Sequence, residues 1–375
     1  MKILSVFGTR PEAIKMAPLL QALHAHPELE SHVCVTAQHR EMLDQVLQLF
    51  DIVPDDDLDL MRQGQTLSDI TTAVLSKLAP VLERVQPDLL LVHGDTTTTF
   101  AAALAAYYQR IPCGHIEAGL RSGNKYAPYP EEMNRRLTGA ICAVHFAPTE
   151  SAAANLRREG VAGRSIFVTG NTVIDALLQA VQKPCDLSGL GLERVNWSKK
   201  VILMTCHRRE NWGAPMMEIF SAVRDVLRER PECELIFPLH KNPLVRELAK
   251  RELGGMAQVH FTEPLDYLPF CHVQQRAYLI LTDSGGLQEE APALGKPVLV
   301  LREVTERPEA IAAGTALLAG TRYGSVRSAA LHLLTDADAY QAMAHAANPY
   351  GDGHAAERIA ALLAADDMRI LLKHD

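Results

Sequence analysis

The stretch M-K-I-L-S-V-F-G-T-R-P-E at residues 1–12 decides the fold, because it joins a short apolar run to a glycine turn and a helix start. Ile3 to Phe7 has the length and apolarity of a buried parallel strand, and Pro11 suits the first turn of the helix that follows. This unit recurs along the chain, with helical periodicity after each apolar run. The other runs are His32 to Thr36, Asp88 to His93, Cys113 to Glu117, Val144 to Ala147, Ile166 to Thr169, Val201 to Thr205, Leu235 to Leu239, Val259 to Phe261, Tyr278 to Thr282 and Val298 to Leu301.

Strands that alternate with helices predict an α/β protein with doubly wound, Rossmann-like parallel sheets. The runs fall into two groups, which predict two such sheets. Between the groups, the stretch from Lys183 to Lys200 contains a proline and two glycines and has weak periodicity. We expect the hinge between two domains in this stretch or in the helix just before it.

Composition excludes several classes of protein. At 375 residues, with 47% hydrophobic and 22% charged residues, the chain is long and apolar enough for two or three globular domains. Lys and Arg number 37 and Asp and Glu 45, so the net charge of -8 disfavours general nucleic-acid binding. The seven cysteines include no C-x-x-C pair, which argues against a disulfide framework and a zinc site. We expect no metal.

The sequence also predicts a cytoplasmic protein without a membrane partner. No run approaches the roughly 20 apolar residues that a transmembrane helix needs. Arg10 and Glu12 end the first apolar stretch without the small-residue pattern of a signal-peptide cleavage site.

Ligands of open α/β sheets bind beyond the carboxyl ends of the strands, where this chain is unusually polar. Anion-binding groups are the first feature of these loops. No loop carries the three-glycine dinucleotide fingerprint, so we expect no nicotinamide cofactor. Arg10 and Lys15, at the start of the first helix, either hold a phosphate or are solvated surface residues. The backbone amides of Ser284, Gly285 and Gly286 either cradle a diphosphate or form an ordinary tight turn.

Three further side chains have one functional and one structural interpretation each. Glu290 either reaches a nucleotide ribose or is an exposed helical glutamate. His207, which two arginines follow, either serves a phosphate leaving group or is an ordinary polar residue. Arg307 either clamps an anion or pairs with Glu306 or Glu309.

Carboxylates are the second feature of the loops. Asp95 follows a buried strand, and Glu117 ends an apolar one, where an unpaired charge would be costly. The structural alternatives are a helix cap for Asp95 and a pair with Arg121 for Glu117. Glu131 opens a helix after a proline, a position that the helix dipole alone explains.

Taken together and in order, these blocks resemble the bacterial non-hydrolysing UDP-N-acetylglucosamine 2-epimerases over nearly the whole chain. The matching blocks are F-G-T-R-P-E-A-I-K at 7–15, A-Q-H-R-E-M-L at 37–43, V-H-G-D-T-T-T-T at 92–99, H-I-E-A-G-L-R at 115–121, P-E-E-M-N-R at 130–135, G-N-T-V-I-D at 170–175, H-R-R-E-N at 207–211, D-S-G-G-L-Q-E-E at 283–290 and N-P-Y-G-D-G at 348–353.

The resemblance implies a GT-B-like architecture with two Rossmann-like domains and a cleft between them. The expected first domain is 1–170 plus a returning C-terminal helix at 355–375, and the expected UDP-binding domain is 171–354. The resemblance also implies a homodimer that needs no cofactor.

The resemblance implies roles for individual residues as well. Asp95, Glu117 and Glu131 would be the catalytic carboxylates, with His207 beside them and with Asp95 and Glu117 also binding the sugar. The UDP site would consist of Arg10, Lys15, His207, Phe270 beside the uracil, Ser284, Gly285, Gly286, Glu290 and Arg307. A second UDP-N-acetylglucosamine, acting as an activator, would lie near Gln38, His39 and Gln65. Two positions depart from the family pattern, Cys206 for a frequent glycine and Leu265 for a frequent polar residue.

The chemistry explains why such an enzyme needs both the carboxylates and the diphosphate-binding residues. The hydrogen on carbon 2 of N-acetylglucosamine is not acidic, but it can leave as a proton while UDP departs from carbon 1. A 2-acetamidoglucal then forms, and UDP and a proton re-add to give UDP-N-acetylmannosamine, a precursor for cell-surface polysaccharides. This route needs diphosphate-binding groups and carboxylates. The alternatives are a hydrolysing epimerase, a GT-B glycosyltransferase and a catalytically silent nucleotide-sugar sensor. Of these, the sensor would not need all three acids.

Overall fold

The computed structural model describes residues 1–37, 40–60, 62 and 64–373, and the chain divides into two compact units. Unit 1 comprises Met1–Ala176 and Tyr350–Asp375, and unit 2 comprises Leu177–Pro349. The first boundary falls within helix α7, Thr172–Ala180, just before the glycine-containing stretch that the sequence singled out. The sequence predicted domain boundaries at 170/171 and 354/355, a few residues from these. That each unit is a separate folding domain stays a prediction.

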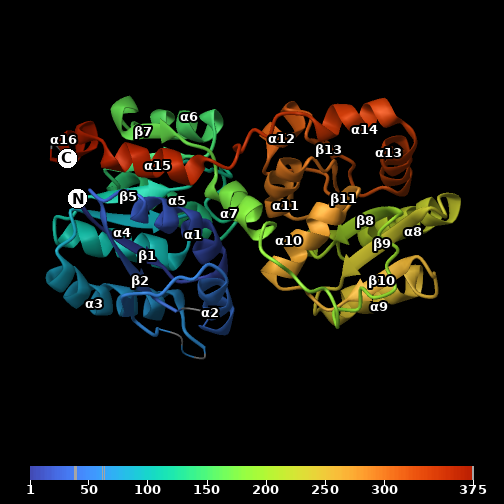
Figure 1. Ribbon diagram of the computed structural model, residues 1–375, viewed down its shortest axis with the longest axis horizontal. Coiled ribbons are helices and arrows are strands. Elements are labelled where there is room, and N and C mark those ends of the chain that lie inside the picture. Colours follow the sequence, from blue (N-terminus) through green and yellow to red (C-terminus); the bar gives the residue numbers. More distant parts are fainter. Residues whose placement is uncertain (38–39, 61, 63, 374–375) are drawn as a thin grey trace. The chain divides into compact units, whose positions relative to one another are not determined.

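Unit 1 is built on a seven-stranded parallel sheet with the order β3-β2-β1-β4-β5-β6-β7. Helices lie against both faces of this sheet (Figure 1). The strands are β1 Lys2–Phe7, β2 Glu30–Val35, β3 Asp56–Asp57, β4 Leu89–His93, β5 Cys113–Ile116, β6 Val144–Ala147 and β7 Ile166–Val168. The helices are α1 Arg10–His24, α2 Arg40–Leu49, α3 Leu67–Val85, α4 Thr97–Tyr108, α5 Glu131–Ile141, α6 Glu150–Arg158, the first half of α7, α15 Ala355–Ala364 and α16 Asp366–Lys373, with a short 3-10 turn at Gly163–Ser165.

Unit 2 contains a six-stranded parallel sheet with the order β10-β9-β8-β11-β12-β13. The strands are β8 Lys200–Thr205, β9 Cys233–Pro238, β10 Val259–Thr262, β11 Leu279–Thr282, β12 Val298–Val300 and β13 Ala316–Leu318. The helices are α8 Ala214–Glu229, α9 Pro243–Leu253, α10 Tyr267–Arg276, α11 Gly285–Glu290, α12 Pro308–Ala312, α13 Tyr323–Thr335 and α14 Ala337–Ala344, with 3-10 turns at Arg209–Asn211 and Ala291–Leu294. The prediction of two parallel α/β sheets is confirmed.

The central strands explain why the sequence folds this way. Leu89 to Val92 of β4 are fully buried, and the same holds for Leu279 and Ile280 of β11. A parallel strand with helices on both faces has no solvated side, so its residues are apolar without alternation. Burial of one such leucine contributes about 1.5–3 kcal/mol, and the polar residues are confined to the strand ends.

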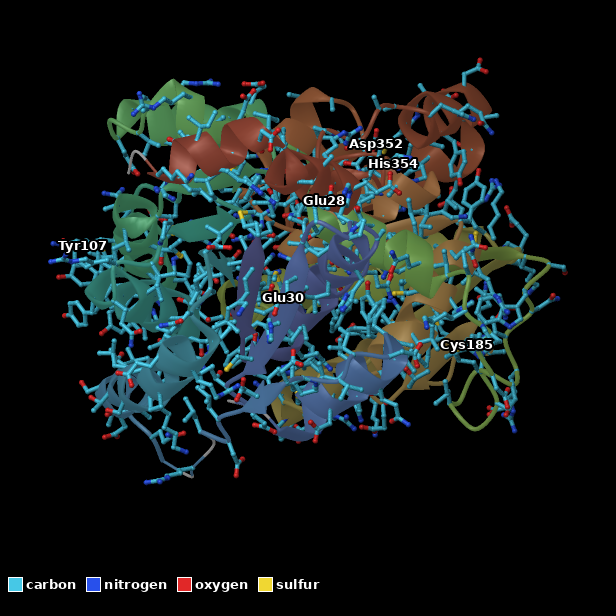
Figure 2. All side chains as sticks on the ribbon, turned by 60° about the vertical axis from the view of Figure 1, so that its left-hand side comes forward. Glu28, Glu30, Tyr107, Cys185, Asp352 and His354 are labelled. Carbon is cyan, nitrogen blue, oxygen red and sulfur yellow. The ribbon has the colours of Figure 1, made fainter. Side chains whose placement is uncertain are left out.

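The C-terminal segment returns to unit 1 through a tight backbone contact. The amide of Asn171 donates to the carbonyl of Tyr350, over 2.7 Å, and a Cβ on Gly170 would lie only 3.3 Å from the Cα of Gly351. Asp352 and His354 precede α15 (Figure 2), and α15 packs against α1. The last helices therefore belong to the unit that contains the N-terminus.

Within the described part of the chain, no helix is both long enough and apolar enough to cross a membrane.

Candidate active site

Two predicted catalytic carboxylates follow neighbouring strands of unit 1. β4 and β5 pair in parallel, with His93 opposite Ile116, and the amide of Gly94 donates to the carbonyl of Ile116 over 2.9 Å. Asp95 and Glu117 come directly after these positions. The sheet therefore brings both residues to the same edge, as the sequence predicted.

Glu117 is held by a lysine and an asparagine from distant parts of the sequence. Lys15 of α1 forms an ion pair with Oε2 of Glu117, and Nδ2 of Asn171 donates to the same oxygen over 2.9 Å. The backbone of Glu117 has φ +63°, an uncommon conformation for a residue with a side chain, and strain of this kind clusters at functional sites. The alternative pair with Arg121 is wrong, because Arg121 binds Glu159 through two hydrogen bonds of 2.8 and 2.7 Å. Lys15, expected at a phosphate, contacts a carboxylate here.

Asp95 is bound by an arginine that the sequence analysis did not assign. Nε and Nη2 of Arg135 donate to Oδ2 of Asp95 over 2.9 and 2.6 Å, and the Asn134 side chain donates to the Asp95 carbonyl over 2.9 Å. Asp95 does not cap α4, because Thr96 does so by accepting from the amide of Thr99. The helix-cap alternative is therefore wrong.

Glu131 and Glu132, adjacent at the start of α5, have different environments. Glu132 is fully buried and accepts hydrogen bonds from the amides of Ser122 and Gly123, over 2.9 and 3.3 Å, and also contacts two arginines of its helix. Oε2 of Glu131 is buried and has no hydrogen-bond partner in the described part of the chain. Glu132 thus stabilises the fold, whereas the Glu131 carboxylate is available to a ligand.

A buried glutamate connects the loops that carry these groups. Oε2 of Glu12 accepts from the amides of Gly8 and Thr9, over 3.1 and 2.8 Å, and Oε1 accepts from the hydroxyls of Thr96 and Thr99, over 2.7 and 3.1 Å. Burial raises the pKa of Glu12, although these donors act in the opposite direction. This carboxyl group fixes the turn before α1 to the start of α4.

Arg10 begins α1, at the end of the turn that Glu12 fixes. Its side chain is partly buried and makes no hydrogen bond or ion pair with any residue that the structure describes. Gly8 is required in this turn, because a Cβ there would lie 1.9 Å from Oγ1 of Thr36. The guanidinium is thus available for an anion.

Two buried histidines on β4 and β5 lie near Glu117. Burial lowers the pKa of His93 to about 4, with Glu117 opposing and Lys15 reinforcing the shift, and burial lowers the pKa of His115 to about 3. Nε2 of His115 donates to the carbonyl of Gly94 over 2.7 Å. Both imidazoles are therefore neutral near pH 7 and add no positive charge beside the carboxylate.

These shifts predict a pH-dependent stability. A folded-state pKa below the ordinary 6.5 means that the unfolded chain binds the proton first, so the free energy of unfolding falls as the pH decreases from 6.5 towards 4. One such group contributes at most about 1.4 kcal/mol per pH unit. His93→Asn should reduce this slope by up to that amount in urea unfolding followed by circular dichroism. The exposed His354 is the control, and equal slopes in wild type and His93→Asn would contradict the prediction.

In unit 2, His207 follows β8 and lies against an acid that follows β11. Nδ1 of His207 is 3.0 Å from Oδ1 of Asp283, and its ring stacks on His240 with centroids 5.8 Å apart. Cys206, the departure noted in the sequence, is buried in the hydrophobic core. Burial and the charge of Asp283 raise the pKa of the Cys206 thiol well above its ordinary value, so the thiol stays protonated.

The glycine turn of unit 2 differs from the sequence expectation in one respect. The amide of Ser284 donates to the hydroxyl of Thr282 over 2.9 Å, so this amide is already bound. Gly285 and Gly286 occupy the first turn of α11, where amides have no partner in their own helix. That Ser284, Gly285 and Gly286 hold the diphosphate stays a prediction, with the Ser284 amide already bound to Thr282.

Arg307 and Glu290 lie next to the two glycines. A Cβ on Gly285 would be 4.0 Å from the Arg307 guanidinium, and a Cβ on Gly286 would be 3.5 Å from Oε1 of Glu290. Nε of Arg307 forms an ion pair with Glu289, an acid that the sequence analysis did not assign to it. The structure thus brings a cation, a carboxylate and two glycines together.

The remaining predicted residues lie elsewhere. Phe270 and Leu265 are partly buried, Phe270 within α10 and Leu265 just before it. Oε1 of Gln65 accepts from the amide of Arg62 over 2.9 Å. Gln38 and His39 are outside the described residues. No group of three or more His, Cys, Asp and Glu among the described residues could hold a metal ion.

Two wholly parallel sheets with polar groups at their carboxyl ends define the GT-B-like class of α/β proteins. A family model described as UDP-N-acetylglucosamine 2-epimerase matches residues 21–364. The chain therefore belongs to the UDP-N-acetylglucosamine 2-epimerase family and is an enzyme of the isomerase class.

Similar proteins align with this chain over nearly their whole length. The UDP-N-acetylglucosamine 2-epimerase of Yersinia pestis is 56% identical over 96% of this chain and 97% of its own. The crystal structure of a UDP-N-acetylglucosamine 2-epimerase of Listeria monocytogenes has a TM-score of 0.91 at 53% identity, over 96% of this chain and 95% of that one. The UDP-GlcNAc 2-epimerase of Neisseria meningitidis, solved bound to UDP-GlcNAc, has a TM-score of 0.85 at 50% identity, over 97% of this chain and 99% of that one.

Proposed function

We propose that this epimerase interconverts UDP-N-acetylglucosamine and UDP-N-acetylmannosamine by eliminating and re-adding UDP. A carboxylate removes the proton from carbon 2 while the bond from carbon 1 to the UDP oxygen breaks, which gives 2-acetamidoglucal and UDP. A proton then adds to carbon 2 from the opposite face, and the UDP oxygen re-forms the bond to carbon 1. The Neisseria protein was solved with UDP-GlcNAc, which supports this substrate.

The observation that carries the proposal is the set of three carboxylates in unit 1. Glu117 is ion-paired with Lys15, Asp95 is bound by Arg135, and the Glu131 carboxylate has a buried oxygen without a hydrogen bond among the described residues. Inversion at carbon 2 needs a group to take a proton from one face and another to return one to the other face. Three acids with different partners suit such a division, because one can take the proton and another can return it.

The groups of unit 2 suit the leaving group. We assign the diphosphate to His207, Arg307, Ser284 and the amides of Gly285 and Gly286, with Arg10 as a further cation. Glu290 is assigned to the ribose and Phe270 to the uracil. Positive and amide groups aimed at the departing UDP stabilise the charge that develops as the bond from carbon 1 breaks.

Proton NMR in heavy water tests this function. With UDP-N-acetylglucosamine and no added cofactor, deuterium should enter carbon 2 and UDP-N-acetylmannosamine should accumulate. Free N-acetylmannosamine and UDP in equal amounts would instead identify a hydrolysing epimerase. Turnover only with a sugar acceptor would identify a transferase, and binding without turnover would identify a sensor.

Four further proposals rest on the family resemblance. The product would supply cell-surface polysaccharide synthesis, the enzyme would be a cytoplasmic homodimer, and a second UDP-N-acetylglucosamine near Gln65 would act as an activator. Gln65 lies in the turn just before α3, where its side chain binds the chain's own backbone.

A further inference from the structure

The turn after β11 contains an acid whose function the family resemblance leaves unassigned. β8 and β11 are adjacent parallel strands, with Thr205 opposite Thr282. His207 and Asp283 follow these strands, so the sheet delivers both side chains to one edge. The Asp283 side chain is fully buried, whereas that of His207 is 38% exposed.

Asp283 contacts the loop of His207 through both carboxylate oxygens. Oδ2 accepts from the backbone amides of His207 and Arg208, each over 2.8 Å, and from the Asn211 side chain over 3.2 Å. Oδ1 lies 3.0 Å from Nδ1 of His207, an ion-pair distance, and this buried oxygen has no hydrogen bond within the described residues. Asn211 also donates to the Leu301 carbonyl over 3.0 Å, so the contact is part of a fixed network.

The 3.0 Å distance between Oδ1 and Nδ1 indicates which nitrogen of His207 carries a proton. Burial of Asp283 opposes its ionisation, but His207 and the two amides outweigh burial and hold the pKa of Asp283 below its ordinary value. An ionised carboxylate offers no proton of its own, so its oxygen 3.0 Å away favours a proton on Nδ1 of His207. Nε2, on the other side of the ring, is left for a ligand.

We propose that Asp283 is a positioning residue, which holds the His207 ring with a protonated Nδ1 towards Asp283, so that Nε2 faces the diphosphate of UDP and donates a hydrogen bond to it when both ring nitrogens are protonated. This inference rests on the proposed role of His207 in UDP binding. A carboxylate behind a histidine orients the ring and stabilises its charged form in other enzyme sites.

Other titratable and charged groups also lie around His207. His240 stacks on the ring, and burial followed by the charge of His207 lowers the pKa of His240. Arg246 also lies close enough to act on His240. Arg208 follows His207 in the loop, and Trp212 binds the His207 carbonyl over 3.3 Å. Asp283 is the acid that directly contacts the His207 ring, which is why its removal should dominate.

Nitrogen-15 NMR of the histidine side chains tests the tautomer without any turnover. Neutral His207 in the wild-type enzyme should carry its proton on Nδ1, and His207→Gln identifies its signals by their loss. In Asp283→Asn, an amide group can donate to Nδ1, so the proton should move to Nε2. A wild-type signal from an Nε2-protonated His207 would overturn the proposal, even if Asp283→Asn does not fold.

Calorimetric titration with UDP then separates positioning from a structural role. Asp283→Asn should weaken UDP binding about tenfold to hundredfold near pH 7, the loss typical of a charge-assisted hydrogen bond. In a His207→Gln background the same change should weaken binding less than threefold, because Asp283 acts through His207. Equal losses in both backgrounds would overturn the proposal. If His207 is protonated on Nδ1 and the effect of Asp283→Asn depends on His207, but no epimerisation occurs, the proposed function is rejected and the role of Asp283 is retained.

Discussion

Replacement of Glu117 by glutamine should lower kcat by about 10²–10⁴-fold, the usual contribution of a positioned acid or base. Glutamine keeps the shape of the side chain and can still accept from Asn171, but it can neither take a proton nor neutralise Lys15. UDP binding should change little, because the proposed UDP ligands are other residues. Rapid-mixing NMR of the epimerisation gives kcat, and titration with UDP gives the affinity.

Glu159→Gln is the matched control for this variant. Glu159 also pairs with a basic residue, Arg121, but it is the residue at the C-terminal end of α6 and a third of its side chain is exposed. Its replacement should leave kcat within about twofold, since neither Glu159 nor Arg121 is assigned to the reaction. A Glu117→Gln enzyme with near-normal kcat would remove Glu117 from the catalytic set.

The strands were predictable because burial on both faces leaves a continuous apolar run. β6 was predicted at its observed residues, and β1, β4 and β11 within one residue at each end. β3 and β13 were not predicted. β3 has only two residues, both aspartates, and β13 has only three, so neither forms an apolar run long enough to indicate a strand. Such strands form because a neighbouring strand offers unpaired backbone groups, which a single segment does not reveal.

The carboxylates of the site could be found from the sequence, but their partners could not. An acid at the end of an apolar strand is a local signal, and it indicated Asp95 and Glu117. Arg135 and Asn171 reach these acids from about 40 and 54 positions away, a separation that local patterns do not constrain. Lys15 shows the same limit, since its sequence position near a helix start indicated an anion but not which one.

Glu12 and Asp283 were missed for a different reason. Each resembles an ordinary residue of a turn or helix start, and only the buried donors around it distinguish it. The Ser284 amide was assigned to a ligand because a glycine-containing turn offers free donors, yet the Thr282 hydroxyl binds it locally. Side-chain competition for backbone donors is therefore the step that the sequence does not determine.

Glu131→Gln should lower kcat by about 10²–10⁴-fold while leaving the melting temperature nearly unchanged. The buried Oε2 of Glu131 makes no hydrogen bond within the described residues, so an amide of the same shape breaks no contact there. Stability and activity should separate, because this carboxylate contributes to the reaction and not to the fold.

Glu132→Gln, at the next residue, should lower the melting temperature and change kcat much less. Removal of one partner from a buried charge network costs about 3–5 kcal/mol, and glutamine loses the charge that Arg135 and Arg136 share. At roughly 2–4 °C per kcal/mol for a unit of this size, the melting temperature should fall by about 6–20 °C in calorimetry. The remaining folded enzyme should keep kcat within about tenfold, because Arg135 retains its two hydrogen bonds to Asp95. Glu131→Gln could instead lower the melting temperature and leave kcat unchanged. The position of Glu131 at a helix start would then explain this residue fully, and Asp95 and Glu117 must supply both proton transfers.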